Sequence, residues 1–214
     1  MGTSTCRSGL SAAAIALREL DPAFATIIDA VDPLSERVAE DRFAELAASI
    51  VSQQLSVKAA DTIWRRFEAL GPVTPEAILG HAEEELRAVG LSGAKTRYVR
   101  DLSLHVVDGR LDLNAVDELD DESVIEALTA VKGIGRWTAE MYLIFALGRP
   151  DVLAVDDLGL RRAAGWLLEL ERPATREELA EAGKRWSPYR SAASRYLWAS
   201  LDNGPAETPE AASR

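Results

Sequence analysis

The sequence predicts an all-α fold, and three observations carry that prediction. Hydrophobic residues make up 47% of the 214 positions, which is enough for a sizeable core in one domain or in two helical lobes. Apolar residues recur at helical spacing along most of the chain, whereas alternating runs of β-branched residues are scarce. Glycines and prolines fall between the helical patterns, where helices begin or end.

The first half of the chain divides at these signals. Asp-Pro pairs and apolar spacing predict helices over residues 11–20 and 22–32. The polar break SQQLS separates the helical patterns 41–51 and 57–70, and Gly71-Pro72 ends the second. Thr74-Pro75 suits a helix start, Gly90 suits a helix end and Gly109 marks a turn. We therefore expect helices over residues 74–79, 83–89 and 93–106.

The second half begins with an acidic stretch that we expect to form a loop. It leads to a predicted helix over residues 121–130, which is followed by two glycines and an apolar helix led by a tryptophan. Three further helical patterns cover residues 157–168, 175–183 and 189–201. The two ends, residues 1–10 and 203–214, have the composition of disordered tails.

Cysteine content and hydropathy exclude several classes of protein. The single cysteine, Cys6, excludes an intramolecular disulfide, a four-cysteine zinc site and a cysteine-ligated iron–sulfur cluster. No apolar run approaches the roughly 20 residues that span a bilayer. The N-terminus lacks a signal-peptide apolar region, and Cys6 stands where a myristoylation motif needs Ser or Thr. We therefore expect a cytoplasmic protein without a membrane partner.

Charge is distributed unevenly along the chain. The net charge of −11 argues against a nucleic-acid partner, and residues 112–126 carry seven acids and no base. By contrast, residues 184–198 carry four bases and no acid, and residues 86–110 carry five bases against two acids. An acidic protein can therefore still present a basic face, although solvated helix surfaces explain each cluster equally well.

A glycine hairpin is the sharpest local signal. In LTAVKGIGRWTAE, Gly133 and Gly135 separate two helical patterns and permit a sharp reversal of the chain. The second helix then starts with exposed backbone amides, and helix N-termini with glycine nests bind anions such as phosphate. Such contacts hold a nucleic-acid backbone without reading its bases. The alternative is a plain connector between two helices.

Taken together, these stretches resemble the helix-hairpin-helix DNA glycosylases. LTAVKGIGRWTAEMYLIFALGRPDVLAVDD resembles the hairpin, the following helix and the catalytic-aspartate loop of that family. ASIVSQQLSVKAADTIW, GLSGAKTRYVRDL and RWSPYRSAASRYLW also match, so the resemblance covers most of residues 41–202. Within the family, the chain is most similar to the 3-methyladenine DNA glycosylase II branch, which excises alkylated bases.

Two departures from other branches sharpen that placement. The iron–sulfur branches have four cysteines near the C-terminus, and this chain has none there. The branches that also nick the backbone carry a Schiff-base lysine just after the hairpin, where this chain has Trp137. Lys132 lies before the first glycine and is out of register. The resemblance therefore implies a monofunctional glycosylase without lyase activity.

The resemblance implies that an aspartate at residue 156 or 157 is catalytic. Breaking an N-glycosidic bond builds positive charge on the sugar, so a nearby carboxylate lowers the barrier and can orient or deprotonate the attacking water. Matching the DD pair of the alkylated-base branch selects Asp157, whereas counting as in the iron–sulfur branches selects Asp156. The competing interpretation of Asp157 is a helix N-cap; if it is catalytic, the other aspartate is expected to be the cap.

The resemblance also implies a pocket for the extruded base. Alkylated purines are cationic, so electron-rich rings select them by stacking and cation–π contact. Trp137 and Tyr189 match pocket aromatics, while Met141 and Leu158 replace tyrosines of longer members. We therefore expect a less aromatic pocket. The alternative role for Trp137 is a core anchor.

Further matches concern the DNA duplex. Gln54 aligns with the residue that fills the gap left by the extruded nucleotide, Gln53 is the adjacent alternative, and a solvated loop is the competing interpretation. The hairpin residues expected to hold the DNA backbone are Val131, Gly133, Ile134, Gly135, Arg136 and Thr138. The residues expected to contact phosphates are Lys95, Arg97 and Arg190.

The predicted architecture is two helical lobes with a cleft between them, within a domain of residues 11–202. One lobe covers about residues 45–140 with the hairpin at 128–139, and the other covers 11–44 and 141–202. The expected protein is a monomer that removes alkylated purines such as 3-methyladenine from double-stranded DNA. No redox cofactor or catalytic metal is implied, although the hairpin carbonyls can bridge a monovalent cation to phosphate. The alternatives are a glycosylase for an oxidised or deaminated base, and a non-catalytic DNA-binding module.

Overall fold

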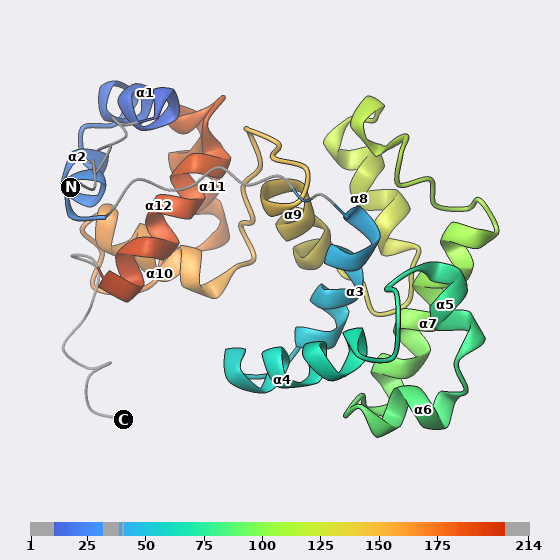
Figure 1. The fold of residues 1–214 in the computed structure, drawn as a ribbon. Coiled ribbons are helices and arrows are strands. Elements are labelled where there is room, and N and C mark those ends of the chain that lie inside the picture. The colour runs from blue at the N-terminus through green and yellow to red at the C-terminus, as the bar shows by residue number, and fades with distance from the viewer. Residues whose placement is uncertain (1–10, 32–38, 40, 204–214) are drawn as a thin grey trace, which may run out of the picture. The chain divides into compact units, whose positions relative to one another are not determined.

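The regular elements of the protein are helices. A computed structural model describes residues 11–31, 39 and 41–203, and this part of the chain contains no strand (Figure 1). The predicted all-α fold class is confirmed. The chain divides into two compact units, one of residues 1–36 and 149–214 and one of residues 37–148.

The first unit joins the N-terminal and C-terminal helices. Its elements are α1 (Ala12–Leu20), α2 (Phe24–Ala30), α10 (Leu158–Leu167), α11 (Arg176–Trp186) and α12 (Arg190–Asn203). Phe24 meets the fully buried Trp186 edge to face, with ring centroids 5.3 Å apart. The Trp186 Nε1 donates a hydrogen bond of 2.9 Å to Asp21, so the indole satisfies its polar atom inside an apolar core.

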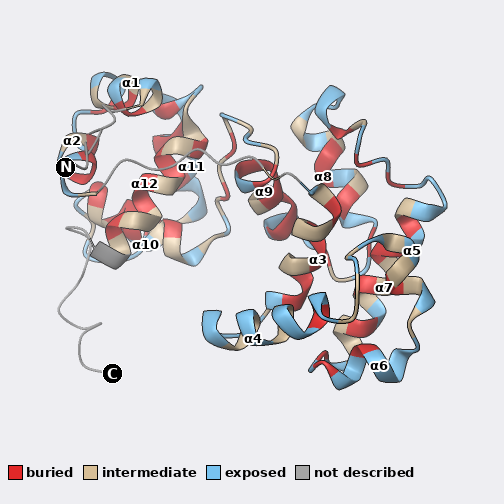
Figure 2. Cartoon of the chain, viewed as in Figure 1, coloured by how far each residue is buried: buried red, intermediate tan, exposed pale blue. Residues whose placement is uncertain are grey.

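The middle unit contains the remaining helices of the described chain. Its elements are α3 (Arg42–Ser52), α4 (Val57–Glu68), α5 (Pro75–Gly80), α6 (Glu83–Ala88), α7 (Gly93–Val107), the 3-10 turn η1 (Val116–Glu118), α8 (Asp121–Thr129) and α9 (Arg136–Phe145). α3 packs on α4, α7 and α9, and α8 packs on α9. Figure 2 shows buried residues concentrated on α3 and α9, whereas α4 buries only Phe67.

Local capping explains why most helices begin where the sequence predicts. The side chains of Ser56, Ser92, Asp120 and Thr175 each accept a hydrogen bond from a first-turn amide of α4, α7, α8 and α11. The observed boundaries differ from the predicted ones by a few residues. The acidic stretch is not wholly a loop, because η1 buries Val116 within it.

The middle unit covers residues 37–148 and thus extends beyond both ends of the lobe predicted for about residues 45–140. The whole of α3 and the whole of α9 belong to the middle unit, because Phe43, Leu143 and Ile144 are buried there. The predicted tails lie outside the described residues except at Asn203, where α12 ends. Asp32, the predicted end of the second helix, also lies outside them. None of the described helices combines the length and hydropathy of a membrane span.

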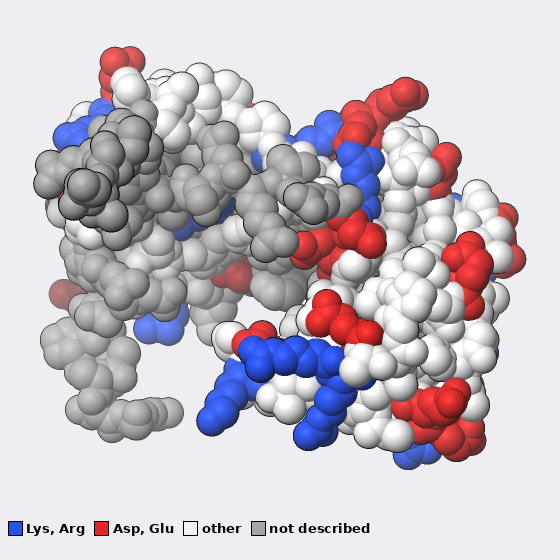
Figure 3. Space-filling view, viewed as in Figure 1, with Lys and Arg blue, Asp and Glu red and all other residues white. Residues whose placement is uncertain are grey.

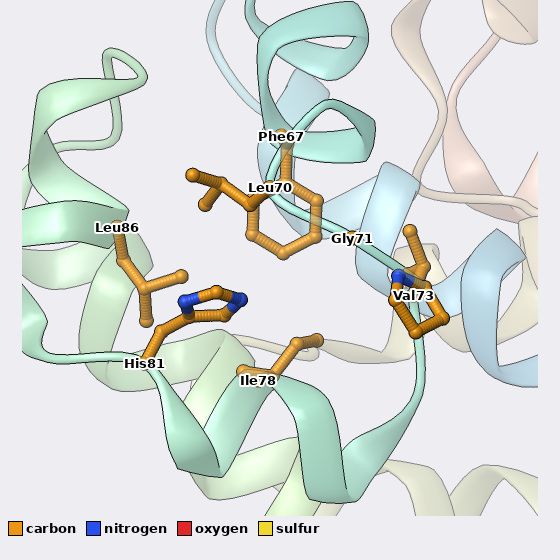
Figure 4. A pocket seen from close by; sticks show the side chains of 8 residues that line it. Phe67, Leu70, Gly71, Val73, Ile78, His81 and Leu86 are labelled. Carbon is orange, nitrogen blue, oxygen red and sulfur yellow. The ribbon is translucent and has the colours of Figure 1, made fainter.

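A small apolar cavity lies where α4, α5 and α6 meet. Figure 4 shows the His81 ring among Phe67, Ile78 and Leu86, and the cavity measures about 10 Å³. That volume holds at most one water molecule. The cavity is therefore a packing gap and is far too small for a purine.

Candidate functional site

Asp157 is the N-cap of α10, and its carboxylate is held by two donors. Its Oδ1 accepts a hydrogen bond of 2.6 Å from the Leu160 amide and one of 2.9 Å from the Trp198 Nε1. The side chain is half-buried. A Cβ added at Gly159 would lie 3.2 Å from the same oxygen, so the glycine keeps space beside the carboxylate. The arrangement fixes the position of a negative charge at a helix N-terminus.

Asp156 has a different environment. It is exposed and forms an ion pair with the exposed Arg176. The expectation that Asp156 would cap the helix if Asp157 were catalytic is wrong, because Asp157 itself caps α10. The cap and the candidate catalytic group are thus one residue, and the two interpretations of Asp157 do not exclude each other.

The hairpin between α8 and α9 depends on Gly133. Gly133 has a φ of +89°, and a Cβ there would lie 2.3 Å from the Tyr98 ring. No other residue type fits both the conformation and the space. Val131 and Ile134 are buried and anchor the hairpin in the middle unit, so their side chains are not available to a ligand.

α9 begins with amides that no side chain caps. Its N-cap, Gly135, has no side chain, and a Cβ added there would meet nothing within 4 Å. Arg136 is held by Glu122 at 2.5 and 3.0 Å and by Glu140 at 3.1 Å, and the Glu122 contact raises the arginine pKa. Thr138 is buried. The hairpin therefore offers backbone amides to an anion, while its arginine already has carboxylate partners.

The turn between α3 and α4 separates the two glutamines. The Gln53 Nε2 donates a hydrogen bond of 2.8 Å to the Gly133 carbonyl, so this side chain points into the middle unit. Gln54 is exposed and has a φ of +58°, which is uncommon for a residue other than glycine. We call residues 53–55 the wedge turn. The geometry presents Gln54 to solvent at its tip.

The three cations expected to contact phosphates differ in availability. Lys95 is half-buried, and its Nζ donates to the Val51 and Gln53 carbonyls at 2.7 Å each. Burial lowers the pKa of Lys95. Arg190 forms a two-pronged ion pair with Asp151 at 2.7 and 2.9 Å, whereas Arg97 is exposed on α7.

The ion pair with Arg190 also affects the pKa of Asp151. Burial alone raises the Asp151 pKa, but hydrogen bonds from Arg190 and Ser187 outweigh burial and lower it. Asp151 therefore binds Arg190 as a carboxylate, which ties the start of α12 to the segment before α10.

The predicted base-pocket residues fall on both units. Trp137 is 47% exposed on the first turn of α9, and Met141 follows it one turn later on the same face. Leu158 is 60% exposed and directly follows Asp157, while Tyr189 packs against the core of its own unit. Two surface grooves, one at α3 and α4 and one at α11, include none of these residues.

Some residues suited to a functional role are not among those that the sequence suggested. Trp198 lies on an apolar helical stripe, which is typical of a core residue, yet its indole donates to Asp157. Lys58, Arg65 and Arg66 are exposed on α4, and Figure 3 shows Lys and Arg side chains gathered over this helix. No local signal reveals the tryptophan contact, but the basic positions of α4 are visible in the sequence directly after the wedge turn.

Helical units, a glycine hairpin anchored by two buried side chains and a carboxylate fixed at a helix N-terminus are typical of a helix-hairpin-helix protein. The chain belongs to the HhH-GPD superfamily of base excision DNA repair proteins, which matches residues 47–188. The match includes the wedge turn, the hairpin and Asp157. The predicted family is confirmed.

Within this superfamily, the chain is similar to several proteins named as 3-methyladenine DNA glycosylases or glycosidases. DNA-3-methyladenine glycosylase 1 of Schizosaccharomyces pombe is 36% identical over 164 residues, which cover 74% of this chain and 72% of that protein. A solved structure of the S. pombe 3-methyladenine DNA glycosylase with abasic DNA has a TM-score of 0.81, with 32% identity, and covers 92% of this chain and 100% of that one. A DNA-3-methyladenine glycosidase from Bacillus halodurans has a TM-score of 0.82, with 38% identity, and covers 95% of this chain and 92% of that one.

Proposed function

We propose that this protein is a monofunctional DNA glycosylase that excises alkylated, cationic purines such as 3-methyladenine and leaves an abasic site. The observation that carries the proposal is the Asp157 carboxylate, fixed by Leu160 and Trp198 within a chain of the base excision repair superfamily. Relatives named 3-methyladenine glycosylases support the alkylated-base substrate.

The chemistry follows from the charge that develops at the sugar. Cleavage of the N-glycosidic bond leaves positive charge on C1′, and an alkylated purine departs as a neutral base because it already carries a positive charge. A carboxylate held in place before the reaction stabilises this charge without reorganising. Asp157 provides the carboxylate, and the same group orients the water that attacks C1′.

Three elements of the middle unit are suited to holding the DNA. The uncapped amides at the start of α9 bind a phosphate, because Gly135 permits close approach of the backbone. Gln54 fills the gap left by the extruded nucleotide. Lys58, Arg65 and Arg66 supply positive charge to phosphates from the helix that follows the wedge turn.

In the middle unit, recognition of the base is assigned to the exposed first turn of α9. Trp137 presents an exposed ring, and ring faces attract cationic bases. Met141 and Leu158 add apolar surface without aromatic character. Of these three side chains only Trp137 offers a ring face, so the proposal favours bases that are already activated to leave and need little stacking.

The further properties belong to the same proposal. The protein acts as a cytoplasmic monomer, and a monovalent cation joins the hairpin to a DNA phosphate. The Gly133 carbonyl already accepts from Gln53, which leaves one lone pair for such a cation.

The test is release of free base from alkylated duplex DNA, measured for the wild type, Asp157→Asn and Asp156→Asn. Asparagine is an N-cap as good as aspartate, so Asp157→Asn removes the charge and preserves the start of α10. We expect Asp157→Asn to bind DNA and release no base, and Asp156→Asn to retain activity. The reverse pattern would move the catalytic role to Asp156. Wild-type binding without release from alkylated, oxidised or deaminated substrates would indicate a non-catalytic binding module.

A further inference from the structure

One face of α7 supports both turns that the proposed function assigns to DNA. Lys95, Tyr98 and Asp101 are spaced three residues apart and therefore lie on the same side of this helix. Lys95 donates to the Val51 carbonyl at the end of α3 and to the Gln53 carbonyl of the wedge turn, and Tyr98 fills the space that a side chain at Gly133 would need. Asp101 accepts a hydrogen bond of 2.8 Å from the Lys132 amide.

Lys95 supplies hydrogen bonds to backbone carbonyls at the C-terminal end of α3. The last carbonyls of a helix have no partners within the helix, and a cation near them is favourable. The Lys95 Nζ lies 2.7 Å from both the Val51 and the Gln53 carbonyls. Two backbone acceptors and partial burial thus occupy the ammonium group and hold it away from a solvent-exposed phosphate.

The wedge turn is also joined directly to the hairpin. The side chain of Gln53 bonds to the Gly133 carbonyl, while the backbone carbonyl of Gln53 bonds to Lys95. Gln54 follows at a φ of +58°, a conformation that persists in a non-glycine residue only where its surroundings impose it. The contacts of Gln53 hold the chain on the N-terminal side of this residue.

We propose that Lys95 is a positioning residue for nucleotide extrusion, which holds the wedge turn in register with the hairpin and does not contact phosphate. The inference rests on the proposed function. Gripping a phosphate and filling the gap in the duplex must occur at a fixed separation, because the two events involve neighbouring nucleotides. The network Lys95–Gln53–Gly133 sets that separation within one unit.

The experiment compares Lys95→Met with Arg97→Met. Both variants remove one positive charge from the same helix, but Arg97 is exposed. The affinity for duplex DNA with a tetrahydrofuran abasic analogue is measured against salt concentration. Each lost phosphate contact reduces the slope of log K against log salt by about 0.9. We expect Lys95→Met to leave this slope unchanged. This expectation holds whether or not Arg97→Met reduces the slope.

A second readout reports wedge insertion without catalysis. 2-Aminopurine placed next to the tetrahydrofuran site brightens when the stack opens, so we expect the signal to fall in Lys95→Met. Base release from a paired lesion should fall about tenfold, and release from an unpaired bubble should change by about twofold or less, because the bubble has already lost its pairing. Gln53→Leu, which cuts the other end of the network, should reproduce this pattern.

Circular dichroism and thermal unfolding establish that each variant is folded at the assay temperature. A reduced salt slope in Lys95→Met, or equal losses on paired and bubble substrates, would overturn the positioning role. Failure of the wild type to release any base would refute the proposed function instead. The 2-aminopurine signal of the wild type still reads wedge insertion in that case, so the two failures are distinguishable.

Discussion

Replacing Trp198 with phenylalanine tests whether the hydrogen bond to Asp157 contributes to catalysis. The change keeps an aromatic ring on α12 and removes one donor, the Nε1 that lies 2.9 Å from the Asp157 Oδ1. A hydrogen bond to a charged group contributes about 1.5–3 kcal/mol. If the bond acts fully in the transition state, its loss lowers the rate roughly 10- to 150-fold, at about 1.4 kcal/mol per factor of ten.

The assay is single-turnover release of base from alkylated duplex DNA at saturating protein. Trp166→Phe is the matched control, because Trp166 packs against the same core from α10 and is also half-buried. Both variants should lose a similar amount of packing, so only Trp198→Phe should lose rate beyond any effect on folding. A Trp198→Phe rate within twofold of the Trp166→Phe rate would show that the Leu160 amide and the backbone suffice to orient Asp157.

Three other predictions concern glycines and one ion pair. Gly133→Ala should lower the free energy of unfolding by about 2–5 kcal/mol, because of the positive φ and the clash with Tyr98. Gly135→Ala should lower it by less than about 0.5 kcal/mol and should weaken DNA binding. Urea unfolding and a binding titration measure the two effects, and equal behaviour of the two variants would contradict the prediction. Gly159→Ala places a Cβ 3.2 Å from the Asp157 Oδ1 and should slow base release about three- to tenfold by crowding Asp157; an unchanged rate would argue against a fixed carboxylate. The Arg172 guanidinium, followed by the Thr175 amide, lowers the Glu178 pKa to about 2, so this pair stabilises the fold above pH 4.5 and the contribution is lost as pH falls towards 2. Arg172→Met should return the Glu178 pKa towards 4.5 in a carboxyl NMR titration, and no rise would contradict the pairing.

The sequence predicted the elements well because the signals that start and stop helices are local. Ser56 and Thr175 cap helices through amides three residues away, so their effect is visible in a short window. Gly133 and Gly135 marked the hairpin for the same reason. The choice between Asp156 and Asp157 as the catalytic residue stays a prediction, and the DD pattern did not reveal that Asp157 is both the N-cap and the candidate catalytic group.

The partners of polar side chains were not predictable, because they lie far apart in the chain. Trp198 is 41 residues from Asp157, and Lys95 is 44 residues from Val51. An apolar stripe predicted a core tryptophan, and a basic cluster predicted a phosphate contact. In each case the hydrogen-bond partner of the side chain is distant in the sequence and cannot be predicted from neighbouring residues.

These long-range partners change how the acidic composition relates to DNA binding. The net charge of −11 argues against DNA binding. Positive charges that are concentrated where phosphates approach offset this repulsion. Arg136, Lys95 and Arg190 are occupied by carboxylates or carbonyls, so they organise the hairpin, the wedge turn and the start of α12. In the proposed function, phosphates are contacted by the uncapped amides of α9 and by the exposed Lys58, Arg65 and Arg66 of α4. Because the amides carry no net charge and release few counterions, we expect the three cations of α4 to supply most of the salt-dependent, non-specific part of the binding. Under the proposed function, so few cations keep binding to undamaged DNA weak, which leaves the protein able to dissociate and to continue its search for a lesion.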